Sequence, residues 1–197
     1  MTIRRGTTRE RILRVLLNES NGSLTKYRLS KKAGASYSWT HEFLKNLEAD
    51  SYIQDTKIQD FRGLIKYWTR IRKKPDRREY LIQRPLQLLH STHLEYALTT
   101  YQAETLIQGY LFPSRIDLYI KQKEKEDGNR LLSGIGLVGS GNVSLLFHDD
   151  HTLYKSREID GLWTVSPPQL IVDLLMEGGV CVEAAELLLD KMEGKNV

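Results

Sequence analysis

The sequence predicts an α+β protein of two domains, and three observations support this. Residues 1–80 show three helical patterns followed by two short β-rich runs, whereas helices and strands alternate further along the chain. Residues 1–80 hold 19 Lys and Arg against 9 Asp and Glu, a net charge of +10, and the remaining residues carry −6. Between them, "RKKPDRRE" (72–79) has no apolar residue except its proline. We therefore predict an N-terminal domain at residues 1–75 and a mixed α/β domain at residues 80–197.

The first 50 residues predict three helices. In "TTRERILRVLLNES", apolar residues recur on one helical face, and Thr7 and Glu10 have the spacing of a capping box. Thr25 is a good cap for a second helix, "KYRLSKKAG", which should end at Gly34, where a positive φ is tolerated. Ser36 then caps a third helix that runs to about residue 49. Two short helices joined at a glycine are typical of a helix-turn-helix.

Two β-rich runs follow the third helix. "YIQDTKI" and "LIKYWTRIR" contain many β-branched and aromatic residues, and "QDFRG" between them places Gly63 where a hairpin could turn. They predict a two-stranded wing. Three helices followed by a wing give the order of a winged helix-turn-helix, a fold that binds double-stranded DNA in many proteins.

The third helix has an apolar side and a polar side. The polar side carries groups that can donate to bases or neutralise phosphates. We predict groove contacts from it and backbone contacts from the wing; the groove set is Ser36, Tyr37, Ser38, His41 and Lys45, and the backbone set is Lys57, Arg62 and Lys66. Trp39 lies between the two sides, and we expect it to pack against the wing. The alternative is a module that binds protein or a small ligand, because charge asymmetry alone does not require DNA.

The second half predicts alternating elements. Helices are expected at "PLQLLHSTH", "YQAETLIQGY", "PPQLIVDLLMEGG" and "VEAAELLLDKMEG", and strands at "YALTT", "RIDLYIK", "VSLLFHD" and "GLWTV". "EKEDGNR" is expected to be a solvated loop. "FHDDH" groups two histidines and two aspartates, but it follows a strand, so we interpret it as a polar turn rather than a metal site.

Composition favours a cytoplasmic protein without a membrane span. No window of about eighteen apolar residues occurs, and the single cysteine, Cys181, cannot form an internal disulfide. We find no spacing that assembles a nucleophilic triad, and we expect no enzyme activity and no cofactor.

A family resemblance follows from two long segments. A winged helix followed by "EYALTTYQAETLIQGYLFPSRIDLYI" and then "IDGLWTVSPPQLIVDLLMEGGVCVEAAELLLDKM" resembles the AbiEi family of transcriptional regulators, the antitoxins of type IV toxin-antitoxin systems. The resemblance implies a repressor of its own promoter, encoded beside a nucleotidyltransferase-like toxin that it need not contact directly. A homodimer on paired half-sites and monomers on neighbouring repeats are both compatible with the sequence.

A second likeness concerns the α/β domain alone. "YALTTYQAETLIQGYLFPSRIDLYI" looks like the strand, helix and acidic strand of minimal nucleotidyltransferases, which hold two metal ions with alternating carboxylates. Here only Asp117 is acidic, because Arg115 and Tyr119 occupy the neighbouring positions on the same face, and Thr99-Thr100 replaces the Gly-Ser turn. If the folds are related, this copy is expected to be catalytically empty; the alternative is a divergent enzyme that uses Asp117.

Overall fold

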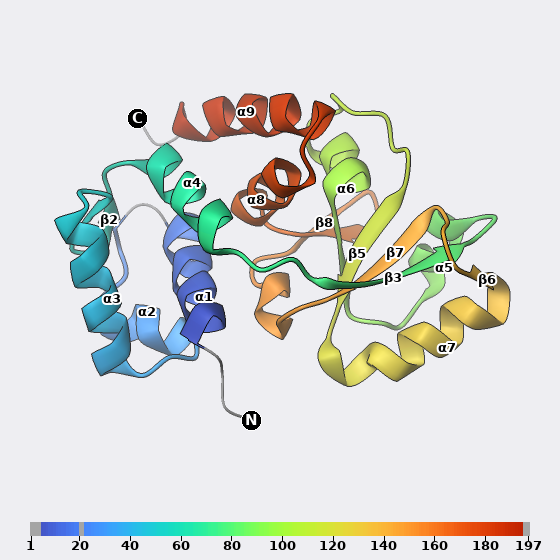
Figure 1. Cartoon of the computed structure of the whole chain (residues 1–197), viewed down its shortest axis with the longest axis horizontal. Helices are drawn as coiled ribbons and strands as arrows, with labels where there is room; N and C mark the ends of the chain where they lie inside the picture. The colour runs from blue at the N-terminus through green and yellow to red at the C-terminus, as the bar shows by residue number, and fades with distance from the viewer. Residues whose placement is uncertain (1–4, 20–21, 195–197) are drawn as a thin grey trace.

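The computed structural model describes residues 5–19 and 22–194 and shows a mixed α+β architecture. In Figure 1 the helices of the N-terminal half lie at the left, a twisted sheet lies at the right, α8 lies between them in the centre, and α9 runs along the top. No helix among the described residues has the length and apolar character needed to cross a membrane.

Four helices and one small hairpin make up the N-terminal half. They are α1 (Arg5–Asn18), α2 (Lys26–Lys32), α3 (Tyr37–Ala49), β1 (Ile53–Gln54), β2 (Lys57–Ile58) and α4 (Phe61–Ile71). The predicted helices at 26–32 and 37–49 are confirmed. The predicted capping box is not formed, because α1 already includes Thr7 and the Glu10 side chain is buried against other partners.

The predicted wing is wrong in its second strand. β1 and β2 pair through only two residues each, and their turn contains Asp55 at φ 58°. "LIKYWTRIR" forms α4 instead, which Asp60 caps by accepting from the Gly63 amide at 2.7 Å. Phe61, Leu64 and Trp68 fall on one helical face and are buried. Burial of this face stabilises the helix more than the β propensity of the run favours a strand.

The second half is built on a seven-stranded sheet of order β6-β3-β7-β5-β4-β9-β8. The parallel pairs are β5 with β7 and β4 with β9, and the other neighbours are antiparallel. The strands are β3 (Asp76–Leu81), β4 (Tyr96–Thr99), β5 (Ile116–Ile120), β6 (Leu137–Val138), β7 (Val143–Phe147), β8 (Arg157–Ile159) and β9 (Leu162–Thr164). The helices are α5 (Pro85–Ser91), α6 (Thr100–Ile107), α7 (Lys125–Ile135), α8 (Pro167–Glu177) and α9 (Val180–Glu193), with two short 3-10 helices, η1 (Gln122–Glu124) and η2 (Asp150–Leu153).

The segment predicted as a domain boundary and the segment predicted as a solvated loop both contain regular structure. The second half of "RKKPDRRE" belongs to β3, which lies between β6 and β7, so the sheet begins at Asp76. "EKEDGNR" lies mostly in α7 rather than in a solvated loop. Gly128 in α7 is buried, and a Cβ added there would lie 2.6 Å from Ile120 Cδ1 of β5, so the Ile120 side chain would have to shift.

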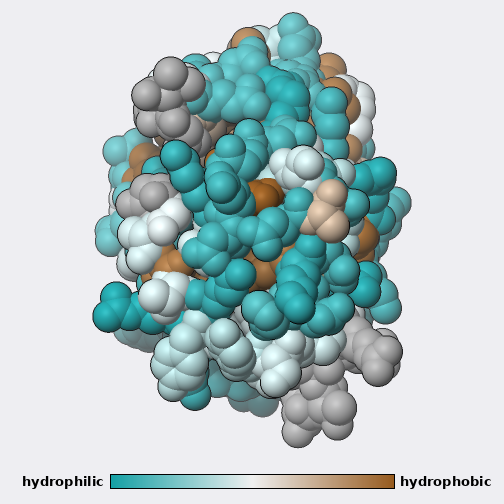
Figure 2. All heavy atoms as spheres, turned by 90° about the vertical axis from the view of Figure 1, so that its left-hand side faces the viewer, coloured by the Kyte–Doolittle hydropathy of each residue, from teal (hydrophilic) through white to brown (hydrophobic). Residues whose placement is uncertain are grey.

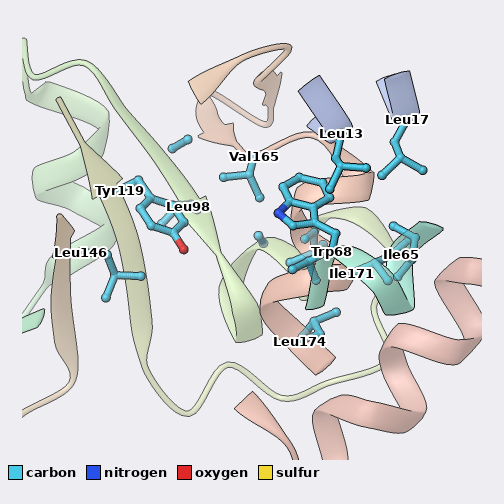
Figure 3. Packing of buried hydrophobic residues seen from close by; sticks show 14 of the residues in the cluster. Leu13, Leu17, Ile65, Trp68, Leu98, Tyr119, Leu146, Val165, Ile171 and Leu174 are labelled. Atoms are coloured by element: carbon cyan, nitrogen blue, oxygen red, sulfur yellow. The ribbon is translucent and has the colours of Figure 1, made fainter. Parts of the chain in front are cut away.

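One apolar core continues from the N-terminal helices into the second half. Trp68 of α4 is fully buried between Leu13 of α1 and Ile171 of α8 (Figure 3). Leu17, Ile65 and Leu174 extend the same cluster, and Leu98, Tyr119 and Leu146 continue it across the sheet. α8 packs against α1 and α4, and its Asp173 accepts hydrogen bonds from Thr99 and Tyr119 of the sheet, so the N-terminal helices are fixed relative to the rest of the protein.

Candidate nucleic-acid interface

A glycine turn joins α2 to α3. Gly34 has φ 61°, and its amide donates to Lys31 O at 3.1 Å, while the Ala35 amide donates to Ser30 O at 2.9 Å. These two bonds form a Schellman motif, which satisfies the last carbonyls of α2 and redirects the chain into α3. The turn therefore fixes the direction in which α3 leaves α2.

The N-terminus of α3 is capped by its own side chains. Ser36 Oγ accepts from the Trp39 amide at 3.4 Å, and Thr40 Oγ1 donates to Ser36 O at 2.8 Å. Thr25 caps α2 in the same way by accepting from the Arg28 amide at 3.2 Å. The Ser36 hydroxyl is thus occupied by a helix cap, although the residue itself is exposed.

The rest of α3 divides into a buried face and an exposed face. Thr40, Phe43, Leu44 and Leu47 are buried, whereas Tyr37, Ser38 and Lys45 are exposed. Figure 1 places α3 at the outer left of the molecule, and Figure 2 shows that this side is mostly hydrophilic.

Two aromatic contacts order this helix. The Tyr37 ring, 48% exposed, stacks on the half-buried His41 ring with centroids 5.9 Å apart. Trp39 packs against Phe43 of its own helix, with ring centroids 5.6 Å apart. Trp39 is therefore half-buried against the core, and it stacks on a ring of α3 rather than on the predicted wing.

The predicted backbone contacts lie in different places. Lys57 is exposed on β2, next to the loop at Gly22. Lys66 is exposed on α4, which is not part of a wing. Arg62 is not at a loop tip; it lies in the first turn of α4 and pairs with Glu186, Asp190 and Glu193 of α9, with N–O distances of 2.6 Å to Asp190 and 3.1 Å to Glu193.

Internal ion pairs account for part of the charge asymmetry. Arg11 contacts Asp149 through Nε and Oδ2 at 2.6 Å, and the three partners of Arg62 also belong to the acidic half. Among the described residues, Arg28, Lys31, Lys45 and Lys57 of the N-terminal half make no ion pair and are exposed. These cations remain available to a polyanion.

A buried network joins α1 and α4 to the second half. Arg72, which follows α4, is 6% exposed and places Nη1 2.7 Å from Glu10 and Nη2 2.9 Å from Asp173. Nη2 also donates to Tyr119 Oη at 2.6 Å. Burial opposes the charge of Glu10, but a hydrogen bond from His148 and the charge of Arg72 outweigh it and lower the Glu10 pKa to about 2.

Arg14 enters the same interior with neutral partners. Its Nε donates to Gln169 at 2.8 Å, its Nη1 lies 3.1 Å from His151 Nδ1, and its guanidinium lies 5.1 Å from the Trp68 ring centroid. Burial, followed by the charge of Arg14, lowers the pKa of His151 to about 4. A neutral His151 therefore accepts at Nδ1 and donates from Nε2 to Lys32 O, 3.0 Å away.

The "FHDDH" run forms this junction. His148 contacts Glu10, Asp149 contacts Arg11, and His151 contacts Arg14 and α2. Among the described residues, no three His, Cys, Asp or Glu side chains are grouped so as to hold a metal ion. The polar residues of this run bind the two halves of the protein together.

Asp117 is fully buried beside the start of α6. Its Oδ2 accepts from Thr100 Oγ1 at 2.5 Å, and both of its oxygens lie 2.9 Å from Arg115 Nε. Thr100 has φ 48°, a strained conformation for a β-branched residue. Protein donors thus surround the single carboxylate at this position.

No family model, no curated protein and no solved structure matches this chain.

Proposed function

We propose that this protein is a sequence-specific DNA-binding transcriptional regulator that uses α3 in the major groove of double-stranded DNA. One observation carries the proposal: two capped helices are joined by the turn at Gly34. The second of them, α3, exposes Tyr37, Ser38 and Lys45 while burying its apolar side. A helix-turn-helix requires this arrangement, because only the outward face of the second helix can enter the groove.

The unpaired cations around α3 support the same proposal. Lys45 on α3, Arg28 and Lys31 on α2 and Lys57 on β2 are exposed and make no ion pair with a described residue. Such side chains neutralise phosphates and release counterions, which drives nucleic-acid binding. Tyr37 and His41 stack on each other, so they would present two rings to the bases with little loss of conformational freedom.

The family resemblance extends the proposal to a biological role. We infer a repressor of its own promoter, and an antitoxin of a type IV toxin-antitoxin system if a nucleotidyltransferase reading frame lies beside its gene. This role is tested by expressing the neighbouring gene, whose product should arrest growth. Expression of the intact chain should relieve the arrest. Absence of such a neighbour, or failure to relieve the arrest, would limit the proposal to a lone regulator.

Electrophoretic mobility shifts across a salt series test the DNA proposal. Binding to the duplex upstream of the gene should weaken steeply with salt, and Lys45→Ala should lower affinity and reduce the slope of log K against log [salt] by about 1. Lys191→Ala removes an exposed lysine from α9 and is the matched control. Absent or salt-independent binding, or an equal effect of both variants, would contradict the proposal.

The same salt titration tests the three predicted contacts to the DNA backbone. Lys57→Ala should reduce the salt slope by about 1, as expected for a phosphate contact. Lys66→Ala tests whether α4 contributes a second phosphate contact. Arg62→Ala should leave the slope unchanged, because its charge is already paired with α9.

A further inference from the structure

A cavity lies beside η2, next to the residues that contact the end of α2. It encloses about 690 Å³, within the size range of small-molecule sites. The loop after α5, the end of β5, the η2 segment and the β8–β9 hairpin form its walls. Six of its lining residues carry a planar ring: His90, His93, Tyr96, His151, Tyr154 and Trp163.

The rings point to a flat ligand. Trp163 lines the cavity from the outward face of β9 and is 43% exposed, although its neighbours Leu162 and Thr164 are buried. Tyr154 stacks on His151 with centroids 4.8 Å apart, so part of the wall is already an ordered aromatic surface. A planar ring would cover the apolar area that Trp163 leaves in contact with water.

The charged groups that line the cavity indicate whether its ligand carries an amino group or a negative charge. Lys121 and Lys123 both pair with Glu95, which accepts from Lys123 at 3.2 Å, so this carboxylate is already engaged by two cations. Asp150 accepts from the Gln122 amide through Oδ1 at 2.7 Å, and its other oxygen bonds to no residue that the structure describes. A carboxylate with an open acceptor favours a ligand with an amino group over an anion.

We propose that this cavity binds a planar heteroaromatic amine and that its occupancy changes the position of α2. His151 and Tyr154 both line the cavity and hold the last residue of α2: His151 Nε2 donates to Lys32 O at 3.0 Å, and Tyr154 Oη bonds to Glu19, the carboxylate that pairs with Lys32 at 3.0 Å. Lys32 lies two residues before the Gly34 turn into α3. The ligand site therefore acts on the turn that directs α3; its regulatory consequence rests on the DNA-binding function proposed above.

Calorimetric titration of the full chain tests the site itself. Adenine and 2-aminobenzimidazole are the probes, and purine and benzimidazole are the analogues without an amino group. At least one amine should bind with a Kd below about 1 mM, and Trp163→Ala should weaken it about tenfold through loss of stacking. Phe112→Ala removes an aromatic side chain that is 93% exposed and outside the cavity, so it is the matched control.

A second variant tests the role of the carboxylate. Asp150→Asn retains the oxygen that accepts from Gln122 and removes the charge, so it should weaken the amines about tenfold and leave purine and benzimidazole unchanged. The assignment is wrong if neither amine binds in this range, if Phe112→Ala weakens binding as much as Trp163→Ala, or if Asp150→Asn weakens both kinds of probe equally.

Two further measurements separate the regulatory step from DNA binding. Saturating ligand should change DNA affinity at least about fivefold, and the duplex should change ligand affinity by the same factor. Amide exchange in residues 26–35 should also change on ligand binding without DNA, and Tyr154→Phe should reduce that change while retaining the ring. If the chain binds no DNA, the exchange measurement still tests the site; if exchange and DNA affinity are both unaffected, the coupling is refuted.

Discussion

Two buried arginines show how the protein places charge in its interior. Arg72 meets two carboxylates, Glu10 and Asp173, and burial, which lowers its pKa, is outweighed by Tyr119, Asp173 and Glu10. Arg14 meets only neutral hydrogen-bond partners, so burial, followed by the charge of Arg72, lowers its pKa to about 10. The cost of a variant at either position depends on the partners that it leaves buried and unpaired.

Replacing Arg72 by Met should be severely destabilising. The substitution keeps an apolar stem but leaves Glu10 and Asp173 buried without their cation, so the free energy of unfolding should fall by about 3–5 kcal/mol. Urea denaturation measures the loss. Lys73→Ala, at an exposed neighbouring position, should change stability by less than about 0.5 kcal/mol. Similar values for the two variants would contradict the assigned role of the network.

The folded protein should lose stability in two acidic steps. The His151 pKa is lowered to about 4 when folded, so the unfolded chain binds a proton more readily, and stability should fall as pH decreases from 6.5 toward 4. The Glu10 pKa is lowered to about 2, so its contribution should be lost between pH 4.5 and 2.

His151→Gln isolates the first step. The variant removes the titrating ring, so stability measured by urea denaturation should change less between pH 6.5 and 4 than in the parent, by on the order of 2 kcal/mol. His93→Gln, at an exposed position on the same domain, is the control and should retain the full pH dependence. An unchanged slope in His151→Gln would show that another group titrates in this range.

Helices were predicted well where caps and apolar spacing agreed. Thr25, Gly34 and Ser36 indicated the ends of α2 and α3, and the structure forms those caps and that turn. In α4 the β-branched and aromatic composition concealed helical spacing, and the Asp60 cap was the signal that would have corrected it. β3 gave almost no apolar signal because Tyr80 is its only buried residue, so backbone pairing with β6 and β7 defines it.

The polar junction was missed for a related reason. Glu10 and Arg14 lie on the same face of α1 as Leu13 and Leu17, at helical spacing, and this placement was the available signal that both would be buried. Their partners, such as Asp173, are distant in sequence, and no local pattern connects them. The exposed face of α3 was easier to predict, since amphipathic spacing alone separates it from the core.

Two glycine variants test the turn between α2 and α3. Gly34→Ala must keep φ near 61°, so the free energy of unfolding measured with urea should fall by about 1–2 kcal/mol. Gly134→Ala is the matched control, because this glycine lies inside α7 with no atom within 4 Å of an added Cβ, and it should stabilise by about 0.5–1 kcal/mol. Equal effects of the two changes would mean that the turn does not require a left-handed residue.

At the scale of the whole molecule, the two halves should unfold together. Trp68, Ile65 and Leu13 share one core with Ile171 and Leu174, and the buried Arg72 network crosses the same boundary. Fluorotryptophan labelling gives probes in each half, at Trp39 and Trp163. Their fluorine resonances should report coincident unfolding transitions, as expected for one cooperative unit. Separate midpoints would show that the N-terminal half is independently stable.

The position of α8 also matters while the protein is being synthesised. The helices that would bind DNA are made first, but the apolar residues that cover α1 and α4 belong to α8, about a hundred residues later in the chain. The sheet is equally late, because β3 pairs with β7 and β4 pairs with β9. A ribosome-bound chain that has not yet released α8 should therefore expose the apolar side of α4 to chaperones and proteases. Only a finished chain should acquire the surface proposed to bind DNA.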